Sequence, residues 1–256
     1  MNIHINKALE QMESISLEEM KNVRLMDRMD FKYVAPISLL PQLLEEAIPY
    51  FKVQEINGSR IAPYCTQYLD TPDLDMFVMH QNGKLNRQKI RIRSYVDSKI
   101  SFLEIKNKNN KGRTKKTRIP VERSHVETIE DLNSNKQFLE ENSVFDIQNL
   151  EPSLANEFDR ITLVNKKGTE RITIDLNLLF INYKTKERKA LENLMVLELK
   201  QDGWKHSEFR DILNKLNIKQ LSFSKYCVGT ALTNSNSQIK YNNLKRKLLK
   251  LIKLTQ

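Results

Sequence analysis

The sequence contains few of the residues that several common protein classes require. Cysteine occurs only twice, as Cys65 and Cys227, and neither belongs to a Cys-x-x-Cys pair. The sequence therefore predicts reduced thiols in a cytoplasmic protein, and neither a disulfide scaffold nor a zinc site. No stretch approaches the ~18 apolar residues of a membrane-spanning helix. The acidic N-terminal region also lacks the apolar core of a signal peptide, so we expect a soluble protein.

Aromatic residues, histidines and nucleotide-binding loops are also scarce. Aromatic residues make up 7% of the chain and do not interleave with its basic segments, which argues against a platform that stacks nucleic-acid bases. The chain contains no Gly-x-x-x-x-Gly-Lys-Ser/Thr loop, so side chains would have to hold any bound nucleotide. The histidines are scattered, and we expect a structural or solvent-exposed role for each of them: His4, His80, His125 and His206.

Positive charge, in contrast, is abundant. The chain has 42 Lys and Arg residues against 32 Asp and Glu residues, which gives a formal net charge of +10. Such an excess favours polyanionic ligands, namely nucleic acid, phosphorylated small molecules or an anionic membrane surface. The apolar fraction of 39% is enough for a core, so we do not expect disorder over the whole length.

Turn and helix signals indicate an antiparallel sheet with a few helices. Five glycines stand between extended segments as candidate hairpin turns: Gly58, Gly83, Gly112, Gly168 and Gly203. The apolar spacing predicts helices over residues 7–25, 37–48 and 208–216, and two helical pieces within 123–158 that are interrupted near Pro152. Most of the remaining chain is predicted to form strands.

We expect three segments along the chain. They are an N-terminal helix over residues 1–26, a main domain over 27–232, and a linker with a basic amphipathic helix over 233–256.

The predicted strands repeat one pattern, in which one face is basic and the other is apolar. Alternate residues of a strand point to the same side, so Arg91 and Arg93 share a face while Ile90 and Ile92 share the opposite one. The polar faces carry many basic residues: Arg28, Lys32, Arg87, Lys89, Arg91, Arg93, Lys106, Lys108, Lys116, Arg118, Arg160, Arg171, Lys200 and Lys225. The same faces carry only four acids: Asp30, Glu104, Asp175 and Glu198.

Two explanations fit this pattern. In the first, each polar face is the ordinary solvated side of a sheet. In the second, the polar faces line an interior that binds a polyanion, because like charges facing each other across a sheet repel unless they are neutralised. The excess of basic over acidic residues favours the second explanation. We therefore expect an α+β fold, with helices packed around a closed antiparallel eight-stranded β-tunnel. About eight strands leave an interior just wide enough for one slim ligand, such as a linear phosphate chain.

Seven short motifs, in this order, are similar to those of a known family. They are Arg28-Met-Asp-Phe-Lys-Tyr33, Tyr68-Leu-Asp-Thr-Pro72, Arg87-Gln-Lys-Ile-Arg-Ile-Arg-Ser-Tyr95, Phe102-Leu-Glu-Ile-Lys106, Glu170-Arg-Ile-Thr-Ile-Asp175, Val196-Leu-Glu-Leu-Lys200 and Ser222-Phe-Ser-Lys-Tyr226. Together they resemble the VTC domain, the polyphosphate polymerase domain of the vacuolar transporter chaperone. That domain belongs to the triphosphate tunnel metalloenzymes of the CYTH-like superfamily. The resemblance covers about residues 24–232.

The resemblance implies a tunnel that holds phosphates, with Glu198 on a divalent metal ion, Mn²⁺ or Mg²⁺, and Ser224 as a phosphate hydrogen-bond donor. Together with the strand pattern, it gives the following catalytic candidates: Lys32, Arg91, Arg93, Arg171 and Lys225. The phosphate-binding candidates are Arg28, Arg87, Lys89, Lys106, Lys116, Arg118, Arg160, Lys200 and Ser224. Asp30, Glu104 and Asp175 are weaker metal-ligand candidates, because each could instead be the counter-ion of a neighbouring Lys or Arg.

The resemblance implies a polymerase that transfers the γ-phosphoryl group of ATP to a growing polyphosphate chain. The sequence departs from the hydrolytic tunnel enzymes, since Arg28 and Val196 stand where paired acids would hold metal and orient water. The first alternative is a metal-dependent hydrolase of inorganic triphosphate or nucleoside triphosphates, and the second is a non-catalytic polyphosphate-binding protein. The expected ligands are ATP, polyphosphate and inorganic triphosphate or pyrophosphate, with no specific nucleic acid.

The C-terminal segment predicts a basic amphipathic helix. Its apolar stripe consists of Leu244, Leu248, Leu251 and Ile252. Six positive charges accompany the stripe: Lys240, Lys245, Arg246, Lys247, Lys250 and Lys253. Such a helix can contact an anionic membrane, guide an emerging polyphosphate, or pack its stripe on the sheet. Because the stripe is narrow and has no Trp or Phe anchor, we favour packing.

Overall fold

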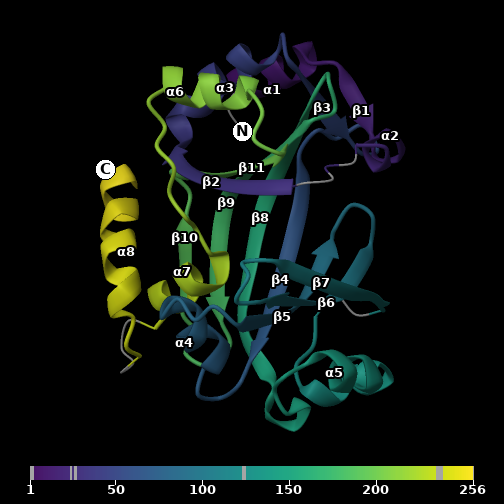
Figure 1. The fold of residues 1–256 in the computed structure, drawn as a ribbon, viewed down its shortest axis with the longest axis vertical. Coiled ribbons are helices and arrows are strands. Elements are labelled where there is room, and N and C mark those ends of the chain that lie inside the picture. Colours follow the sequence, from purple (N-terminus) through teal and green to yellow (C-terminus); the bar gives the residue numbers. More distant parts are fainter. Residues whose placement is uncertain (1–2, 24, 26–27, 123–124, 235–238, 256) are drawn as a thin grey trace.

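An antiparallel sheet with helices packed against it forms the framework of the protein, so the α+β class is as predicted. The computed structural model describes residues 3–23, 25, 28–122, 125–234 and 239–255. Its arrangement is shown in Figure 1. The strands are β1 (Ser14–Ser16), β2 (Arg28–Pro36), β3 (Phe51–Glu55), β4 (Ala62–Asp70), β5 (Arg87–Tyr95), β6 (Ile100–Lys108), β7 (Thr114–Val121), β8 (Glu151–Asn165), β9 (Glu170–Asn182), β10 (Arg188–Leu191) and β11 (Leu194–Asp202).

The helices are shorter and more numerous than the sequence predicts. They are α1 (Ile3–Gln11), α2 (Leu17–Lys21), α3 (Leu40–Ala47), α4 (Asp75–Gln81), α5 (Lys136–Asn142), α6 (Glu208–Lys215), α7 (Lys225–Leu232) and α8 (Asn242–Thr255). Three 3₁₀ segments, Ile37–Leu39, Ile129–Asn135 and Ile147–Asn149, complete the list for the described residues.

The sheet is open, and the prediction of a closed eight-stranded tunnel is wrong. Its hydrogen bonding runs through eight strands in the order β2-β11-β9-β8-β4-β5-β6-β7, and β1, β3 and β10 attach beside this path, for eleven strands in all. Within the described residues, β2 and β7 do not pair. The free edge of β2 is instead met by the segment before α7, because Tyr33 forms an isolated bridge with Gln220 and Leu221 N donates to the carbonyl of Lys32. The sheet also branches at β8, where β3 pairs near Leu163 and β4 pairs along Glu151–Arg160.

The predicted helix over residues 7–25 is divided into α1 and α2 by the short strand β1, which pairs in parallel with β3. Ser16 and Glu19 form the expected capping box, which begins α2 and does not continue α1. Residues 24 and 26–27 lie outside the described residues. The helices predicted over 37–48 and 208–216 are confirmed as α3 with its preceding 3₁₀ turn and as α6.

Two other sequence predictions need correction. The region 123–158 is helical only up to Asn149, because β8 begins at Glu151 and includes Pro152. Residues 123–124 lie outside the described residues, as do residues 235–238 of the predicted linker. Among the candidate hairpin glycines, Gly83 instead follows the C-terminus of α4 and Gly203 follows β11.

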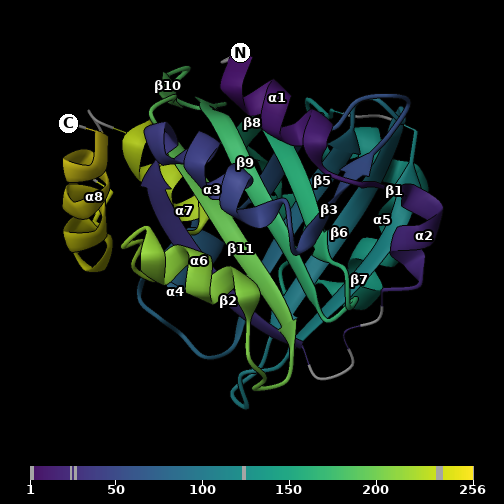
Figure 2. The ribbon, with the colours of Figure 1, turned by 90° about the horizontal axis from the view of Figure 1, so that it is seen from above.

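Two hydrophobic cores cover the sheet. In one, α1, α3 and α6 pack on the apolar side chains of β8, β9 and β11, including Ile161, Ile174 and Leu197. Figure 2 shows these three helices lying over those strands. In the other, α4, α5, α7 and α8 pack with β4, β5 and β6, including the fully buried Ile90 and Leu103. The helices thus cover the apolar faces, as the alternating pattern predicts.

Helix α7 lies unusually close to the sheet because it contains Gly229. A Cβ atom at this position would lie 2.4 Å from Cδ1 of Phe180 and 2.7 Å from Cδ2 of Leu154. Only a glycine allows this approach without displacing the core. The close packing matters for the site, because α7 begins at Lys225.

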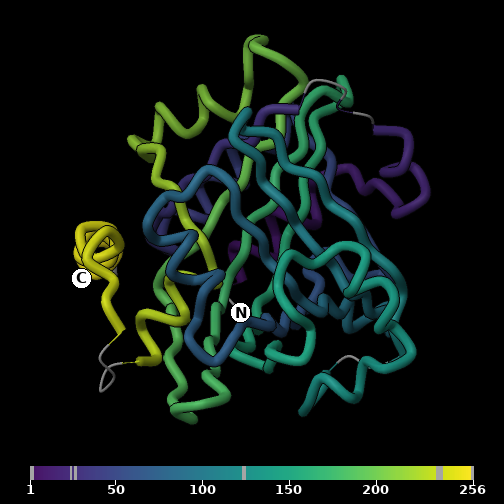
Figure 3. The backbone as a smooth tube through the Cα atoms, turned by 60° about the horizontal axis from the view of Figure 1, so that its bottom comes forward, coloured from purple at the N-terminus to yellow at the C-terminus, as the bar shows by residue number. Residues whose placement is uncertain are grey.

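Helix α8 packs its leucine stripe on the rest of the molecule. Leu244, Leu248 and Leu251 are buried in the core that contains α7, whereas Ile252 is 48% exposed. Figure 3 shows α8 as a separate coil at the side of the backbone trace. The prediction that the stripe packs is therefore confirmed, apart from Ile252. Among the described helices, none is long and apolar enough to cross a membrane.

Candidate phosphate-binding site

The strand register gathers basic residues on one side of the sheet, which we call the cationic face. Directly paired residues of neighbouring strands point to the same side. Lys32 pairs with Glu198, which pairs with Thr173 of β9. Arg160 of β8 pairs with Asp175 of β9. At the other wing, Arg91 pairs with Tyr68 and Glu104. The cationic face consists of Lys32, Lys89, Arg91, Arg93, Lys106, Arg160, Arg171 and Lys200, with Lys225 added from α7.

Asp175 is the centre of the first cluster on this face. Arg160 donates to it through Nε at 2.6 Å and through Nη2 at 2.8 Å, and Lys225 forms a further ion pair. Burial would raise the pKa of Asp175, but Arg160 and Lys225 outweigh burial and hold that pKa well below its usual value. The carboxylate is only 4% exposed and its oxygens are engaged by cations. Asp175 therefore acts as a counter-ion that fixes Arg160 and Lys225.

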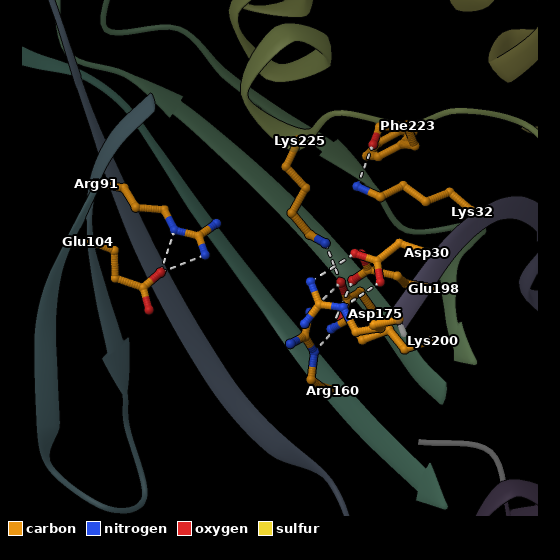
Figure 4. Close-up of polar contacts among 11 residues, drawn as sticks. Asp30, Lys32, Arg91, Glu104, Arg160, Asp175, Glu198, Lys200, Phe223 and Lys225 are labelled. Atoms are coloured by element: carbon orange, nitrogen blue, oxygen red, sulfur yellow. Dashed lines mark hydrogen bonds and ion pairs between the residues drawn. The ribbon is translucent and has the colours of Figure 1, made fainter. Parts of the chain in front are cut away.

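Glu104 is the centre of the second cluster. Its side chain is fully buried, and Oε2 accepts from Arg91 Nη2 at 2.6 Å and from Arg91 Nε at 2.9 Å. Lys116 pairs with the other oxygen. Burial would raise the pKa of Glu104, but Arg91 and Lys116 outweigh burial, and the pKa is lowered to about 2. Figure 4 shows this pair opposite the Asp175 cluster. Glu104 is thus also a counter-ion.

Several cations of this face have no counter-ion. Within the described part of the chain, no ion pair with a carboxylate is recorded for Lys32, Lys89, Arg93, Lys106 or Arg171. Lys89 instead donates to Ser224 Oγ at 3.1 Å, and Lys32 donates to the carbonyl of Phe223 at 3.3 Å. Arg93 donates to Thr66 Oγ1 at 3.2 Å. A row of half-buried cations without carboxylates is suited to bind the oxygens of a polyanion.

The electrostatic cost of this arrangement appears in the pKa values. Arg91 and burial lower the pKa of Lys106 to about 6, and burial lowers that of Lys89 to about 7. Burial, followed by Arg160 and Arg93, lowers the pKa of Lys225 to about 8, although Asp175 opposes the shift. Burial and the neighbouring Arg91 and Arg160 lower the pKa of Arg93 to about 10. Each shift shows that the ligand-free site disfavours positive charge that an anion would stabilise.

We expect the ligand-free protein to become more stable as pH rises from about 6 to 8. Lys106, Lys89 and Lys225 have folded pKa values below the ordinary lysine value, so the unfolded chain binds more protons in this range. The penalty of charging these lysines in the folded protein is then relieved with rising pH. Urea denaturation at each pH measures the effect, and Lys106→Gln should flatten the profile. Stability that falls between pH 6 and 8 would contradict this description of the site.

Glu198 is the one metal-ligand candidate that keeps a free oxygen. Its Oε2 lies 3.4 Å from Lys200 Nζ, and no partner is recorded for Oε1 among the described residues. Both oxygens of Asp30 are paired with Arg28, at 2.8 and 3.2 Å. The described residues contain no group of three or more acids, histidines or cysteines that could hold a metal by themselves. Mg²⁺-type ions are often bound by one or two carboxylates together with substrate phosphates. Glu198 fits that arrangement. The described residues do not form a preformed metal cage.

The remaining candidates lie toward the edges of the face. Arg28 and Arg118 are exposed, and Arg118 stacks at 4.3 Å over the ring of Phe102. Arg87 donates to the carbonyl of Lys84 at 2.6 Å. Lys225 begins a helix and does not lie in a strand, contrary to the alternating pattern, because Ser224 caps α7 by accepting from Cys227 N at 3.3 Å. Their roles in phosphate binding stay predictions.

Two residues that position the site were not identified as such from the sequence. Asp70, fully buried at the end of β4, accepts from the backbone N–H groups of Met76 and Phe77 at 2.9 and 3.0 Å. It also accepts from the hydroxyl of Tyr226, the residue after Lys225. The acid between a strand and the apolar run of α4 is a helix-start signal that could have indicated part of this role. Asp70 thus ties α4 to the start of α7.

We expect Tyr226→Phe to reduce the free energy of tripolyphosphate binding more than it reduces the free energy of unfolding. The phenylalanine keeps the stacking on Tyr68, at 4.9 Å between ring centroids, but loses the bond to Asp70 that orients the first turn of α7. Leaving one partner of a buried hydrogen bond unsatisfied costs about 1–3 kcal/mol of stability. Calorimetric titration and urea denaturation separate the two effects. Unchanged affinity would show that the bond to Asp70 does not position Lys225.

Aromatic rings also lie beneath the cations, where the sequence pattern gave no indication of them. The ring of Phe158 lies 4.4 Å from Lys225 Nζ and 5.2 Å from the guanidinium of Arg160. Arg160 also lies 4.8 Å from the ring of Tyr64. The faces of the aromatic rings thus attract Arg160 and Lys225. N–H groups of these cations that do not donate to Asp175 can then donate to a ligand.

Three solved structures are similar to this chain at low identity. A proposed adenylyl cyclase from Hippeastrum with a dominant triphosphatase activity has a TM-score of 0.46 at 15% identity, covering 85% of this chain and 99% of that one. A proposed adenylate cyclase from Bacillus halodurans has a TM-score of 0.45 at 14% identity, covering 78% and 96%. The PH1819 protein from Pyrococcus horikoshii has a TM-score of 0.44 at 13% identity, covering 80% and 98%.

No curated protein matches the chain. A family model does match, and it covers residues 27–234, the part of the chain that contains the whole cationic face. The chain therefore belongs to the VTC domain family.

Proposed function

We propose that the protein is a polyphosphate polymerase, which transfers the γ-phosphoryl group of ATP to the end of a polyphosphate chain on the cationic face. The observation that carries this proposal is the row of half-buried cations without carboxylate partners, Lys89, Arg93, Lys106 and Arg171. A linear phosphate chain offers several negative oxygens, which can bind several cations at once. Membership in the VTC domain family supports the same ligand class.

The chemistry requires positioning and charge stabilisation more than acid–base catalysis. A terminal oxygen of the polyphosphate chain attacks the γ-phosphorus, the bond from that phosphorus to the β–γ bridging oxygen breaks, and ADP leaves with the electron pair. The attacking oxygen is already ionised near neutral pH, so no general base is needed. Arg91, Arg93 and Arg160 can stabilise the charge that spreads over the transferred group.

A divalent ion, Mn²⁺ or Mg²⁺, would be held by Glu198 together with phosphate oxygens. Such an ion neutralises phosphate charge and orients the group that is transferred. Its identity is part of the proposal.

The environment of Glu198 favours transfer to phosphate over transfer to water. Hydrolysis is favoured by a group that accepts a proton from water, and a carboxylate is one such group. Burial would raise the pKa of Glu198, but Lys200, Lys32 and Arg160 hold it well below its usual value. Glu198 is therefore a poor proton acceptor. A hydrolase of inorganic triphosphate or of nucleoside triphosphates is for this reason the second candidate.

Incubation of the protein with ATP and Mn²⁺ tests the proposal. We expect ADP and long polyphosphate in gels and by ³¹P NMR. ADP with free phosphate alone would identify a hydrolase, and binding of polyphosphate without turnover would identify a binding protein. Either result overturns the polymerase proposal.

Further parts of the sequence prediction remain proposals. They are the cytoplasmic location, the division into segments 1–26, 27–232 and 233–256, and peripheral contact of α8 with an anionic membrane.

A further inference from the structure

Helix α8 lies beyond the part of the chain that matches the VTC family model, yet it reaches one of the family-like motifs. Lys247 Nζ donates to Ser222 Oγ at 2.6 Å. Ser222 stands two residues before Ser224, whose hydroxyl accepts from Lys89. An ammonium group from α8 therefore lies beside the segment that leads into Lys225.

The position of α8 is fixed by both apolar and polar contacts. Its three buried leucines pack into the core that contains α4 and α7. Just before the helix, the carbonyl of Lys240 accepts from Gln81 Nε2 at 3.0 Å, and Asn243 Nδ2 donates to Asn82 Oδ1 at 3.3 Å. These contacts join the beginning of α8 to the end of α4. The helix thus holds Lys247 in a defined place.

His80, at the end of α4, lies among four cations. Burial, followed by the nearby charges of Lys89, Arg87, Lys32 and Lys247, lowers its pKa to about 2. Its Nδ1 atom is buried and has no hydrogen-bond partner among the described residues. In the described ranges, no carboxylate ion pair is recorded for any of these four cations. A buried polar atom beside cations that have no carboxylate partner is suited to bind an anion.

We propose that Lys247 and His80, together with Arg87 and Lys89, form an additional phosphate subsite at the margin of the cationic face. Lys247 supplies charge, and the neutral imidazole donates a hydrogen bond from Nδ1–H to a phosphate oxygen. Ser224 and Lys89 join this subsite to Lys225 and Asp175. The subsite binds a phosphate unit of a polyphosphate chain that extends past the central cluster, so α8 increases affinity for long chains.

This inference deepens the proposed function and rests on its ligand class.

Helix α8 carries positive charges on two different sides, which distinguishes polyphosphate binding from membrane contact. Both lysines are exposed, but Lys247 flanks the buried leucine stripe and contacts Ser222, whereas Lys253 lies on the side away from that stripe. A membrane would contact the outer side, and the polyphosphate subsite uses the inner one.

A pair of substitutions that remove the same charge tests the proposal. Lys247→Gln and Lys253→Gln are compared by calorimetric titration with long polyphosphate and with tripolyphosphate, without ATP. We expect Lys247→Gln to weaken binding of long polyphosphate about tenfold and tripolyphosphate about twofold or less. Lys253→Gln should have little effect on either, because charges beyond about 10 Å are screened at 0.1 M salt. The side chain of His80 reaches the subsite from α4. His80→Ala should therefore reproduce the effect of Lys247→Gln.

Three other binding results would count against the subsite. Equal weakening by Lys247→Gln and Lys253→Gln would mean that α8 supplies only general positive charge. If Lys247→Gln bound long polyphosphate as tightly as the unmodified protein, Lys247 would not contact the polyphosphate chain. If Lys247→Gln instead reduced only binding to vesicles containing phosphatidylserine, α8 would be a membrane element. Absence of polymerisation with ATP would overturn the proposed function alone, because these titrations measure binding without turnover.

Discussion

Replacing Arg93 with alanine should lower the rate of phosphoryl transfer by about 100-fold or more and leave the free energy of unfolding unchanged or higher. Arg93 has no carboxylate partner and donates only to Thr66 Oγ1 among its recorded hydrogen bonds. Burial, Arg91 and Arg160 disfavour its charge. Its removal therefore relieves repulsion in the ligand-free protein and removes a cation that a phosphate would neutralise.

Arg91→Ala is the matched control, since Arg91 lies two residues away on the same face. Its loss leaves the fully buried Glu104 with Lys116 as its remaining ion-pair partner. Removing one partner of a buried pair costs about 3–5 kcal/mol, so this variant should be inactive and clearly destabilised. Turnover assays and urea denaturation of both variants provide the comparison. Equal destabilisation, or normal turnover in Arg93→Ala, would show that the two arginines have been assigned incorrectly.

Glu198→Gln should abolish most turnover and strengthen binding of tripolyphosphate in the absence of metal. The substitution removes a negative charge beside Lys200, so phosphate oxygens meet less repulsion. Loss of a metal ligand removes several kcal/mol of transition-state stabilisation, which corresponds to a rate decrease of at least about 100-fold. In titrations, Mn²⁺ should increase the affinity of the unmodified protein for tripolyphosphate and have no such effect on the variant.

Asp175→Asn distinguishes a metal ligand from a counter-ion. Asp175 engages Arg160 and Lys225, so its neutralisation leaves two buried cations unpaired and should destabilise the protein by about 3–5 kcal/mol. The Mn²⁺ effect on binding should remain in whatever fraction of this variant is folded. If Glu198→Gln retained the Mn²⁺ effect, Glu198 would not hold the metal.

The alternation of basic and apolar residues predicted which side chains share a face, because that periodicity follows from strand geometry alone. Arg91, Arg93 and Lys106 are therefore placed as expected. The strand pattern did not reveal that Lys225 begins a helix, because alternation in Phe223-Ser224-Lys225 resembles a strand. Ser224 instead caps α7. This local choice depends on how α7 packs against Phe180 and Leu154.

Closure of the sheet and the roles of the acids could not be predicted, because both depend on long-range contacts. The edge of β2 that would close the sheet is met by Gln220 and Leu221, which no local pattern indicates. Glu104 and Glu198 occupy the same side of their strands, and only the three-dimensional distances show that Arg91 engages the first closely and that the second keeps a free oxygen.

The melting temperature in the presence of tripolyphosphate tests most directly whether the cationic face is a polyphosphate site. A ligand at a hundred times its Kd stabilises the folded protein by about 2.7 kcal/mol. For a chain of this size, that corresponds to an increase of roughly 5–10 °C, which high salt should reduce. Sodium chloride at matched ionic strength is the control. We predict a large increase with tripolyphosphate alone, and no increase at millimolar tripolyphosphate, or an equal increase with the salt, would contradict the assignment.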